Sequence, residues 1–267
     1  MLNITTKFEI NIEPQTPIDP IEVADFSLRW KIPAIVTHPA MFHHISMAAA
    51  TRNARAAVGM TLDFPRGDNF GANKVNLLPG EAPESAFFDI LLGNNRTEAD
   101  YKNEIRFLGD FIRSLNPMAT IRYTLDTAIR TEECVNKVLK VLQTQPCDWI
   151  RTNHFTHSDR KIDHEANIQK IRSVIATPIK ISGSIGVDEV IKYSKYKNVR
   201  FDISFENAKN IVKRLSESSE AIAVNKQIGD GDIVYLDGDV DGNPVDNKET
   251  NPVDNKETTT PPQVSDR

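Results

Sequence analysis

The sequence of 267 residues contains only two cysteines, Cys134 and Cys147. Two cysteines cannot form a disulfide framework or a cysteine-rich zinc site, so a reducing, cytoplasmic setting is expected. No run of about 18 apolar residues occurs, and the sequence therefore predicts no membrane-spanning helix. The first ten residues, MLNITTKFEI, lack the basic and apolar regions of a secretory signal. We expect a cytoplasmic protein with no membrane partner.

The chain also lacks an excess of positively charged residues. The chain has 32 Lys and Arg residues against 37 Asp and Glu residues, a net charge of -5. Residues 229–267 hold ten of the acidic residues and three of the basic ones, a net charge of -7, which leaves +2 for residues 1–228. A nearly neutral body offers no strongly basic face, so a nucleic-acid partner is not expected.

The C-terminal segment has little apolar content. The octapeptide NPVDNKET occupies residues 243–250 and recurs at residues 251–258. Such a segment cannot bury enough apolar surface to offset its chain entropy. We therefore predict two regions, a folded domain over residues 1–228 and a disordered acidic tail over residues 229–267.

Within the domain, short apolar β-branched runs alternate with stretches of helical period. The runs cover residues 6–12, 34–38, 56–64, 86–92, 119–126, 148–153, 178–182 and 199–204, and the helical stretches cover residues 21–30, 42–51, 98–115, 131–144, 165–175, 187–196 and 205–215. Alternation of this kind is typical of a parallel sheet covered by helices. Eight strands in about 215 residues favour a closed (β/α)8 TIM barrel. No glycine-rich nucleotide-binding motif follows a strand, which counts against an open doubly wound sheet.

Polar residues stand near the ends of the predicted strands, where TIM barrels carry their chemistry. These residues are Thr37, His38, Asp63, Asp89, Asp126, Arg151, Asn153, Lys180, Ser182, Asp202 and Ser204. Asp89 and Lys180 lie in otherwise apolar runs, where a charge is costly to bury without a partner. Two interpretations stay open. The pair serves catalysis, or it is a structural ion pair that fills the mouth of the barrel.

Several of these segments resemble one family in its order and spacing. The segments are AIVTHP, ARAAVGMTLDFPRGDN, FFDILLG, IRYTLDT, DWIRTNHF and PIKISGSIG. Together they resemble strands two to seven of the deoxyribose-phosphate aldolases, class I aldolases on a TIM barrel, over roughly residues 17–215. The motifs are short, and their order is the stronger signal.

The resemblance assigns roles by position. Asp89 corresponds to the acidic proton-relay residue, and Lys180 to the lysine of the seventh strand, which neighbours the Schiff-base lysine. Ser182, Gly183 and Ser204 fall near the phosphate-binding turns. Asn153 replaces a family glycine after the sixth strand, and we include it among the candidate substrate- and phosphate-binding residues.

The sixth strand departs from the family. Arg151 stands where the Schiff-base lysine belongs, and a guanidinium cannot form an imine. The catalytic candidates are therefore Asp89, Lys180 and Arg151, in a protein whose lyase activity is in doubt.

Three interpretations follow from this departure. The chain is a lyase that uses Lys180 as nucleophile, a degenerate barrel that binds a small phosphorylated or anionic ligand, or a barrel kept for structure and assembly. We expect Asp89 within salt-bridge or one-water reach of Arg151 or Lys180, in a pocket of net positive charge. No cofactor and no metal is expected, and homo-oligomerisation is left open.

Overall fold

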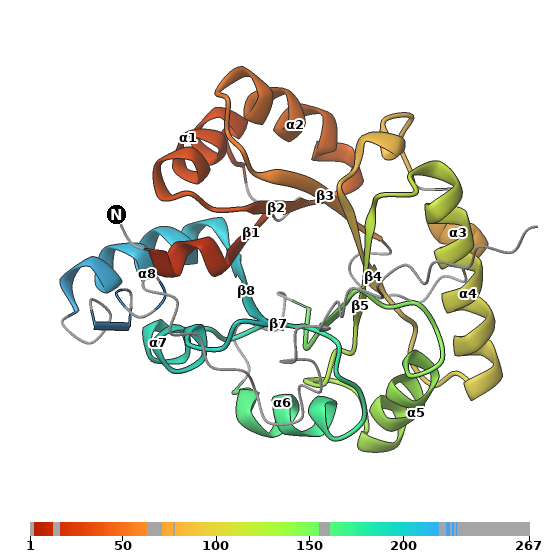
Figure 1. Ribbon diagram of the computed structural model, residues 1–267. Coiled ribbons are helices and arrows are strands. Elements are labelled where there is room, and N and C mark those ends of the chain that lie inside the picture. Colours follow the sequence, from red (N-terminus) through yellow and green to blue (C-terminus); the bar gives the residue numbers. More distant parts are fainter. Residues whose placement is uncertain are drawn as a thin grey trace, which may run out of the picture.

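Eight parallel strands close into a barrel in which each strand pairs with its neighbours in the sequence and β8 pairs with β1 (Figure 1). The computed structural model describes residues 3–12, 17–62, 71–76, 78–154 and 161–218, together with Ala223, Val224, Lys226 and Ile228. The strands are β1 (Phe8–Ile12), β2 (Ala34–Thr37), β3 (Ala57–Leu62), β4 (Phe87–Leu91), β5 (Thr120–Thr124), β6 (Trp149–Arg151), β7 (Ile179–Ser182) and β8 (Val199–Ser204). The predicted (β/α)8 barrel is confirmed.

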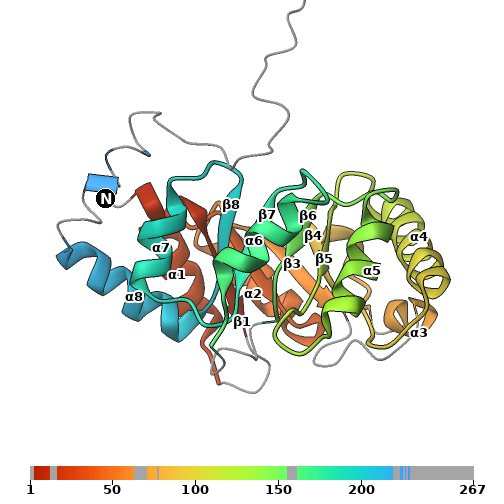
Figure 2. The same ribbon diagram turned by 90° about the horizontal axis from the view of Figure 1, so that it is seen from below.

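Helices surround the barrel on its outside (Figures 1 and 2). The α-helices are α1 (Pro20–Trp30), α2 (Phe42–Thr51), α3 (Gly71–Val75), α4 (Glu98–Leu115), α5 (Glu132–Leu142), α6 (His164–Arg172), α7 (Val187–Ser194) and α8 (Phe205–Glu217), and the short 3-10 helices are η1 (Asn3–Lys7), η2 (Pro39–Met41) and η3 (Ala82–Glu84). None of the helices in the described part of the chain is long and apolar enough to cross a membrane. The predicted tail, residues 229–267, lies outside the described residues, and the boundary at residue 228 stays a prediction.

Local sequence explains where the helices begin. Asp19 precedes α1, accepts a hydrogen bond from the Ile21 backbone N–H at 2.9 Å, and is followed by Pro20 at the first helical position. Thr97 begins α4 with a capping box, because its hydroxyl accepts from the Asp100 backbone N–H while the Asp100 carboxylate accepts from the Thr97 backbone N–H. These caps satisfy backbone donors that the first helical turn leaves without partners.

The two faces of each strand serve different purposes. Side chains such as Ile10, Ile35, Phe88, Tyr123 and Phe201 are buried in the core that joins the strands to the helices. Because side chains alternate along a strand, the residues between them point into the barrel. The barrel interior therefore receives Glu9, Asp89, Arg122 and Lys180 as well as apolar residues.

An apolar patch inside the barrel supports this charged group. Ala34, Val36 and Phe87 form a small cluster separate from the main core. Gly59 on β3 makes room for it, because a Cβ atom at this position would lie 2.2 Å from the Phe87 ring. The Arg122 guanidinium lies 3.4 Å from the centroid of the same ring, a cation–π contact.

Candidate functional site

Six charged side chains meet inside the barrel, each from a different strand. They are Glu9 on β1, Asp89 on β4, Arg122 on β5, Arg151 on β6, Lys180 on β7 and Asp202 on β8. None is more than 3% exposed. The three carboxylates and three cations have a formal charge of zero, so the group is internally compensated.

Lys180 stands at the centre of this group. Its Nζ lies 2.7 Å from Asp89 Oδ2, 2.8 Å from Glu9 Oε2 and 3.3 Å from Asp202 Oδ1. An ammonium group has three hydrogens to donate, and three carboxylates stand within reach of them. The amine is therefore held by ion pairs.

Arg151 is fixed by a neighbouring set of contacts. Its NH2 group forms an ion pair with Asp202 Oδ2 and lies 3.4 Å from Ser182 Oγ, and its NH1 group lies 3.9 Å from Asp89 Oδ2. Ser182 Oγ in turn donates to Asp202 Oδ2 at 2.7 Å. Asn11 adds its amide, 3.3 Å from Asp202 Oδ1. Asp202 thus joins β1, β6, β7 and β8.

Glu9 links the remaining cations. It forms an ion pair with Arg122 and a second one, at 3.2 Å, with the half-buried Arg200. Burial alone would raise the pKa of Glu9, but the positive charges of Arg122, Lys180 and Arg200 outweigh burial and hold the pKa well below its ordinary value. The pKa of Asp202 is lowered in the same way, because Arg151 and Lys180 outweigh its burial.

The structure confirms one expectation about this cluster and corrects another. Asp89 lies within salt-bridge reach of both Lys180 and Arg151, as predicted. The predicted net positive pocket is wrong, because Glu9 and Asp202 bring two further carboxylates to the same cations. The sequence does carry a signal for Glu9 and Arg122, since each alternates with apolar residues in a short β-branched run.

The four candidate ligand-binding residues lie after β6, in β7 and the turn that follows it, and at the end of β8. Ser182 is engaged with Asp202. Gly183 has a φ of +108°, a conformation that favours glycine, and a Cβ there would lie 2.3 Å from Ile162 Cδ1. Ser204 immediately precedes α8, and its side chain makes no capping hydrogen bond. The structure brings these residues to the C-terminal end of the barrel without assigning them a ligand.

Asn153 has a structural task. Its Oδ1 accepts hydrogen bonds from Thr127 Oγ1 at 2.9 Å and from the Ala128 backbone N–H at 2.7 Å. Both donors belong to the connection between β5 and α5. Its Oδ1 therefore fixes that loop, while the amide nitrogen is buried with no partner among the described residues.

The end of β4 is held by a second set of polar contacts. Lys74 donates to the Leu91 carbonyl oxygen, Arg130 to that of Leu92, and Tyr101 to that of Gly93 at 2.7 Å. These three consecutive carbonyl groups lie at the end of β4 and just after it, two to four residues beyond Asp89. Their side-chain partners fix the backbone that carries this carboxylate.

Metal and thiol chemistry find little support in the described part of the chain. It contains no group of three or more His, Cys, Asp or Glu side chains arranged to hold a metal ion. Both cysteines are free thiols, and burial raises the pKa of Cys147 to about 12. A thiol with so high a pKa is a poor nucleophile near neutral pH.

Comparison with known proteins finds solved barrels of similar fold. The structure is similar to deoxyribose phosphate aldolase from Aeropyrum pernix, described as tetrameric, with a TM-score of 0.62 and 14% identity over 85% of this chain and 91% of that one. It is also similar to the aldolase QR15, with a TM-score of 0.63 and 20% identity over 80% of this chain and 98% of that one. No protein-family model and no curated protein sequence matches the chain. At these identities the likeness establishes the fold.

Proposed function

We propose that this protein binds a small phosphorylated aldehyde or sugar at the C-terminal mouth of an aldolase-like barrel without forming a Schiff base. The observation that carries the proposal is how two of the three interior cations, Arg151 and Lys180, are paired. Arg151, which the sequence resemblance aligns with the nucleophilic lysine of the deoxyribose-phosphate aldolases, is paired with Asp202. Lys180, the remaining amine, is surrounded by three carboxylates.

Imine formation needs an unprotonated amine that can approach a carbonyl carbon. The contacts of Lys180 oppose this approach. Its Nζ forms ion pairs with Glu9, Asp89 and Asp202, and its side chain is fully buried. A guanidinium stays protonated in proteins, so Arg151 cannot replace it. On this proposal, none of the six buried charged residues serves as the nucleophile that class I chemistry requires.

The mouth above this interior suits an anion. Ser204 leads into α8, a helix of 13 residues, and its hydroxyl is not used as a cap. The first backbone N–H groups of a helix attract phosphate, since they lack intrahelical partners and the helix dipole is positive there. Gly183, in the turn after β7, has a positive φ that favours glycine. These groups support binding through the phosphate.

Calorimetric titration of the full chain with deoxyribose 5-phosphate and with deoxyribose tests this proposal. We expect the phosphorylated sugar to bind and the plain sugar to bind much more weakly, with Ser204→Ala reducing the difference. Borohydride reduction in the presence of the sugar phosphate, followed by mass spectrometry, should yield no adduct. An adduct mapped to Lys180 would instead identify an active lyase.

A structural role is the second candidate, and one observation favours it. The six buried charges sum to zero, so the interior is balanced in charge without a ligand. Failure of both sugars to bind, together with the absence of an adduct, would favour this role over the first.

A further inference from the structure

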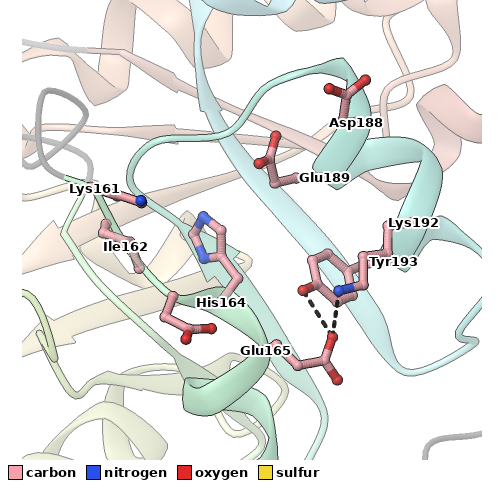
Figure 3. Close-up of a pocket in the computed structure, with 9 residues that line it drawn as sticks. Lys161, Ile162, His164, Glu165, Asp188, Glu189, Lys192 and Tyr193 are labelled. Carbon is pink, nitrogen blue, oxygen red and sulfur yellow. Dashed lines mark hydrogen bonds and ion pairs between the residues drawn. The ribbon is translucent and has the colours of Figure 1, made fainter.

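A cleft of about 480 Å³ lies outside the barrel between the segment that leads into α6 and the first turns of α6 and α7 (Figure 3). Its lining includes one buried histidine, His164, among charged side chains. This cleft is separate from the charged group inside the barrel.

His164 presents a buried acceptor with no described partner. The residue is 4% exposed, and its Nε2 lies 2.8 Å from the Ser184 carbonyl oxygen. Because a carbonyl only accepts, Nε2 carries the hydrogen, and in the neutral ring Nδ1 holds a lone pair. Burial lowers the pKa of His164, which favours that neutral ring. Among the described residues, none donates a hydrogen bond to Nδ1.

The charges around the histidine are mostly negative. Four carboxylates and two lysines line the cleft, a net charge of -2. Glu165 is already engaged by Lys192 at 2.7 Å and by the Tyr193 hydroxyl at 3.1 Å, the contacts drawn as dashed lines in Figure 3. Glu189 accepts from the Gly186 backbone N–H at 2.9 Å.

Asp188 differs from these acids, because within the described ranges its carboxylate has no hydrogen bond or ion pair. Figure 3 shows the His164 ring between Lys161 and Glu189, with Asp188 on the same side as Glu189. A ligand that reaches both groups must donate hydrogen bonds at one end and carry positive charge.

We propose that this cleft binds a small organic ammonium ion, which donates an N–H to His164 Nδ1 and forms an ion pair with Asp188. A buried acceptor without a partner costs free energy, and an N–H donor from the ligand removes that cost. A metal cation is a poorer occupant, because the described residues offer no suitable group of metal ligands. An ammonium ion supplies the donor and the charge together.

Titration of the full chain with 1,4-diaminobutane tests the proposal, with uncharged 1,4-butanediol as the matched probe. The variant Asp188→Asn removes the charge and keeps the shape, and we expect it to weaken binding by ~10-fold, the scale of one charge-assisted hydrogen bond. Asp110→Asn makes the same change at an exposed position of α4 and should leave binding unaltered. The ¹⁵N resonance of His164 Nδ1 should shift as the diamine is added.

Three results would overturn the proposal. Diaminobutane could fail to bind at concentrations up to about 10 mM, well above the range of specific small-ligand sites. Asp188→Asn and Asp110→Asn could weaken binding equally, which would indicate general attraction to an acidic surface. Binding could also leave the His164 resonance unmoved, and the occupant would then lie elsewhere.

Discussion

Glu9 illustrates how a single residue can hold several buried cations in place. It contacts Arg122, Lys180 and Arg200, and its side chain is fully buried. A buried ion pair gains little over an apolar pair of the same shape, yet removing one partner is costly because the other charge loses its compensation. The net contribution of the Glu9 carboxylate to stability is therefore small, but its removal would leave buried cations without compensation.

Replacement of Glu9 by glutamine should accordingly destabilise the protein. Three interior cations would then face two carboxylates, and we expect the free energy of unfolding to fall by ~3–5 kcal/mol. Urea denaturation of the full chain measures this change. Glu98→Gln is the matched control, since Glu98 pairs with Lys140 at the surface, and exposed pairs of this kind contribute about 0–1 kcal/mol. Equal effects of the two substitutions would contradict a structural role for the buried charge.

The same cluster bears on whether a lysine at position 151 could form an imine. In Arg151→Lys the new amine would face Asp202, which now pairs with Arg151. We expect little aldehyde trapping by this variant, and more by Arg151→Lys combined with Asp202→Asn, because the second change removes the carboxylate that retains the proton. Borohydride reduction with acetaldehyde and intact-mass measurement distinguish the variants. Trapping in the unmodified chain at the level of the double variant would refute this account.

At the scale of elements, β3 and β4 fit together through one missing side chain. The Phe87 ring fills the space where Gly59 has no Cβ, and it also supports the Arg122 guanidinium. Protein interiors are packed so closely that one added carbon atom changes stability. The β3–β4 contact and the charged group above it thus depend on the same glycine.

Gly59→Ala should therefore destabilise the barrel. A Cβ atom 2.2 Å from the Phe87 ring forces the ring to move, and overpacking of this kind costs ~1–3 kcal/mol. Gly80→Ala provides the control, because no atom lies within 4 Å of its added Cβ. Thermal denaturation of both variants measures the difference. An unchanged melting temperature for Gly59→Ala would mean that the ring adapts freely.

The elements themselves could largely be predicted from the sequence. The helix bounds 42–51 and 98–115 agree with α2 and α4, since caps and helical period act locally. Predicted strand ends extend too far, as in residues 148–153 against β6 (Trp149–Arg151), because the pairing with β5 ends at Arg151 although Thr152 and Asn153 are still buried. The interior pairing could not be predicted. Glu9 and Lys180 are 171 residues apart, and only closure of the barrel brings them together. The roles of Asp89, Arg151 and Lys180 stay predictions.

At the scale of the whole molecule, the buried carboxylates make stability depend on pH. The pKa of Glu9 is lowered from 4.5 and that of Asp202 from 3.8, in each case because neighbouring cations outweigh burial. In the unfolded chain both groups take up protons at their ordinary pKa values, while the folded protein resists protonation. Stability is therefore fully present above about pH 4.5 and is lost as the pH falls toward the lowered values.

Melting temperatures measured from pH 7 down to pH 3 should show this loss. The steep decline should begin near pH 4.5, where Glu9 of the unfolded chain begins to protonate. Asp202→Asn should melt at a lower temperature at pH 7 and show a shallower decline with acid, because one contributing carboxylate is gone. If the melting temperature of this variant fell with pH as steeply as that of the unmodified protein, Asp202 would not contribute to the pH dependence.

The distribution of charge among the strands also bears on how the chain folds during synthesis. Glu9 emerges first and Asp202 last, with Asp89, Arg122, Arg151 and Lys180 between them. A nascent chain that ends before β8 already contains Arg151 and Lys180 but lacks Asp202, one of the two carboxylates that contact both cations. If such a fragment closed its interior, a buried cation would stay uncompensated. The free-energy cost of that charge is a large part of the free energy of unfolding of a typical domain. We expect the barrel to form as one cooperative unit after translation of β8, with no stable half-barrel before it.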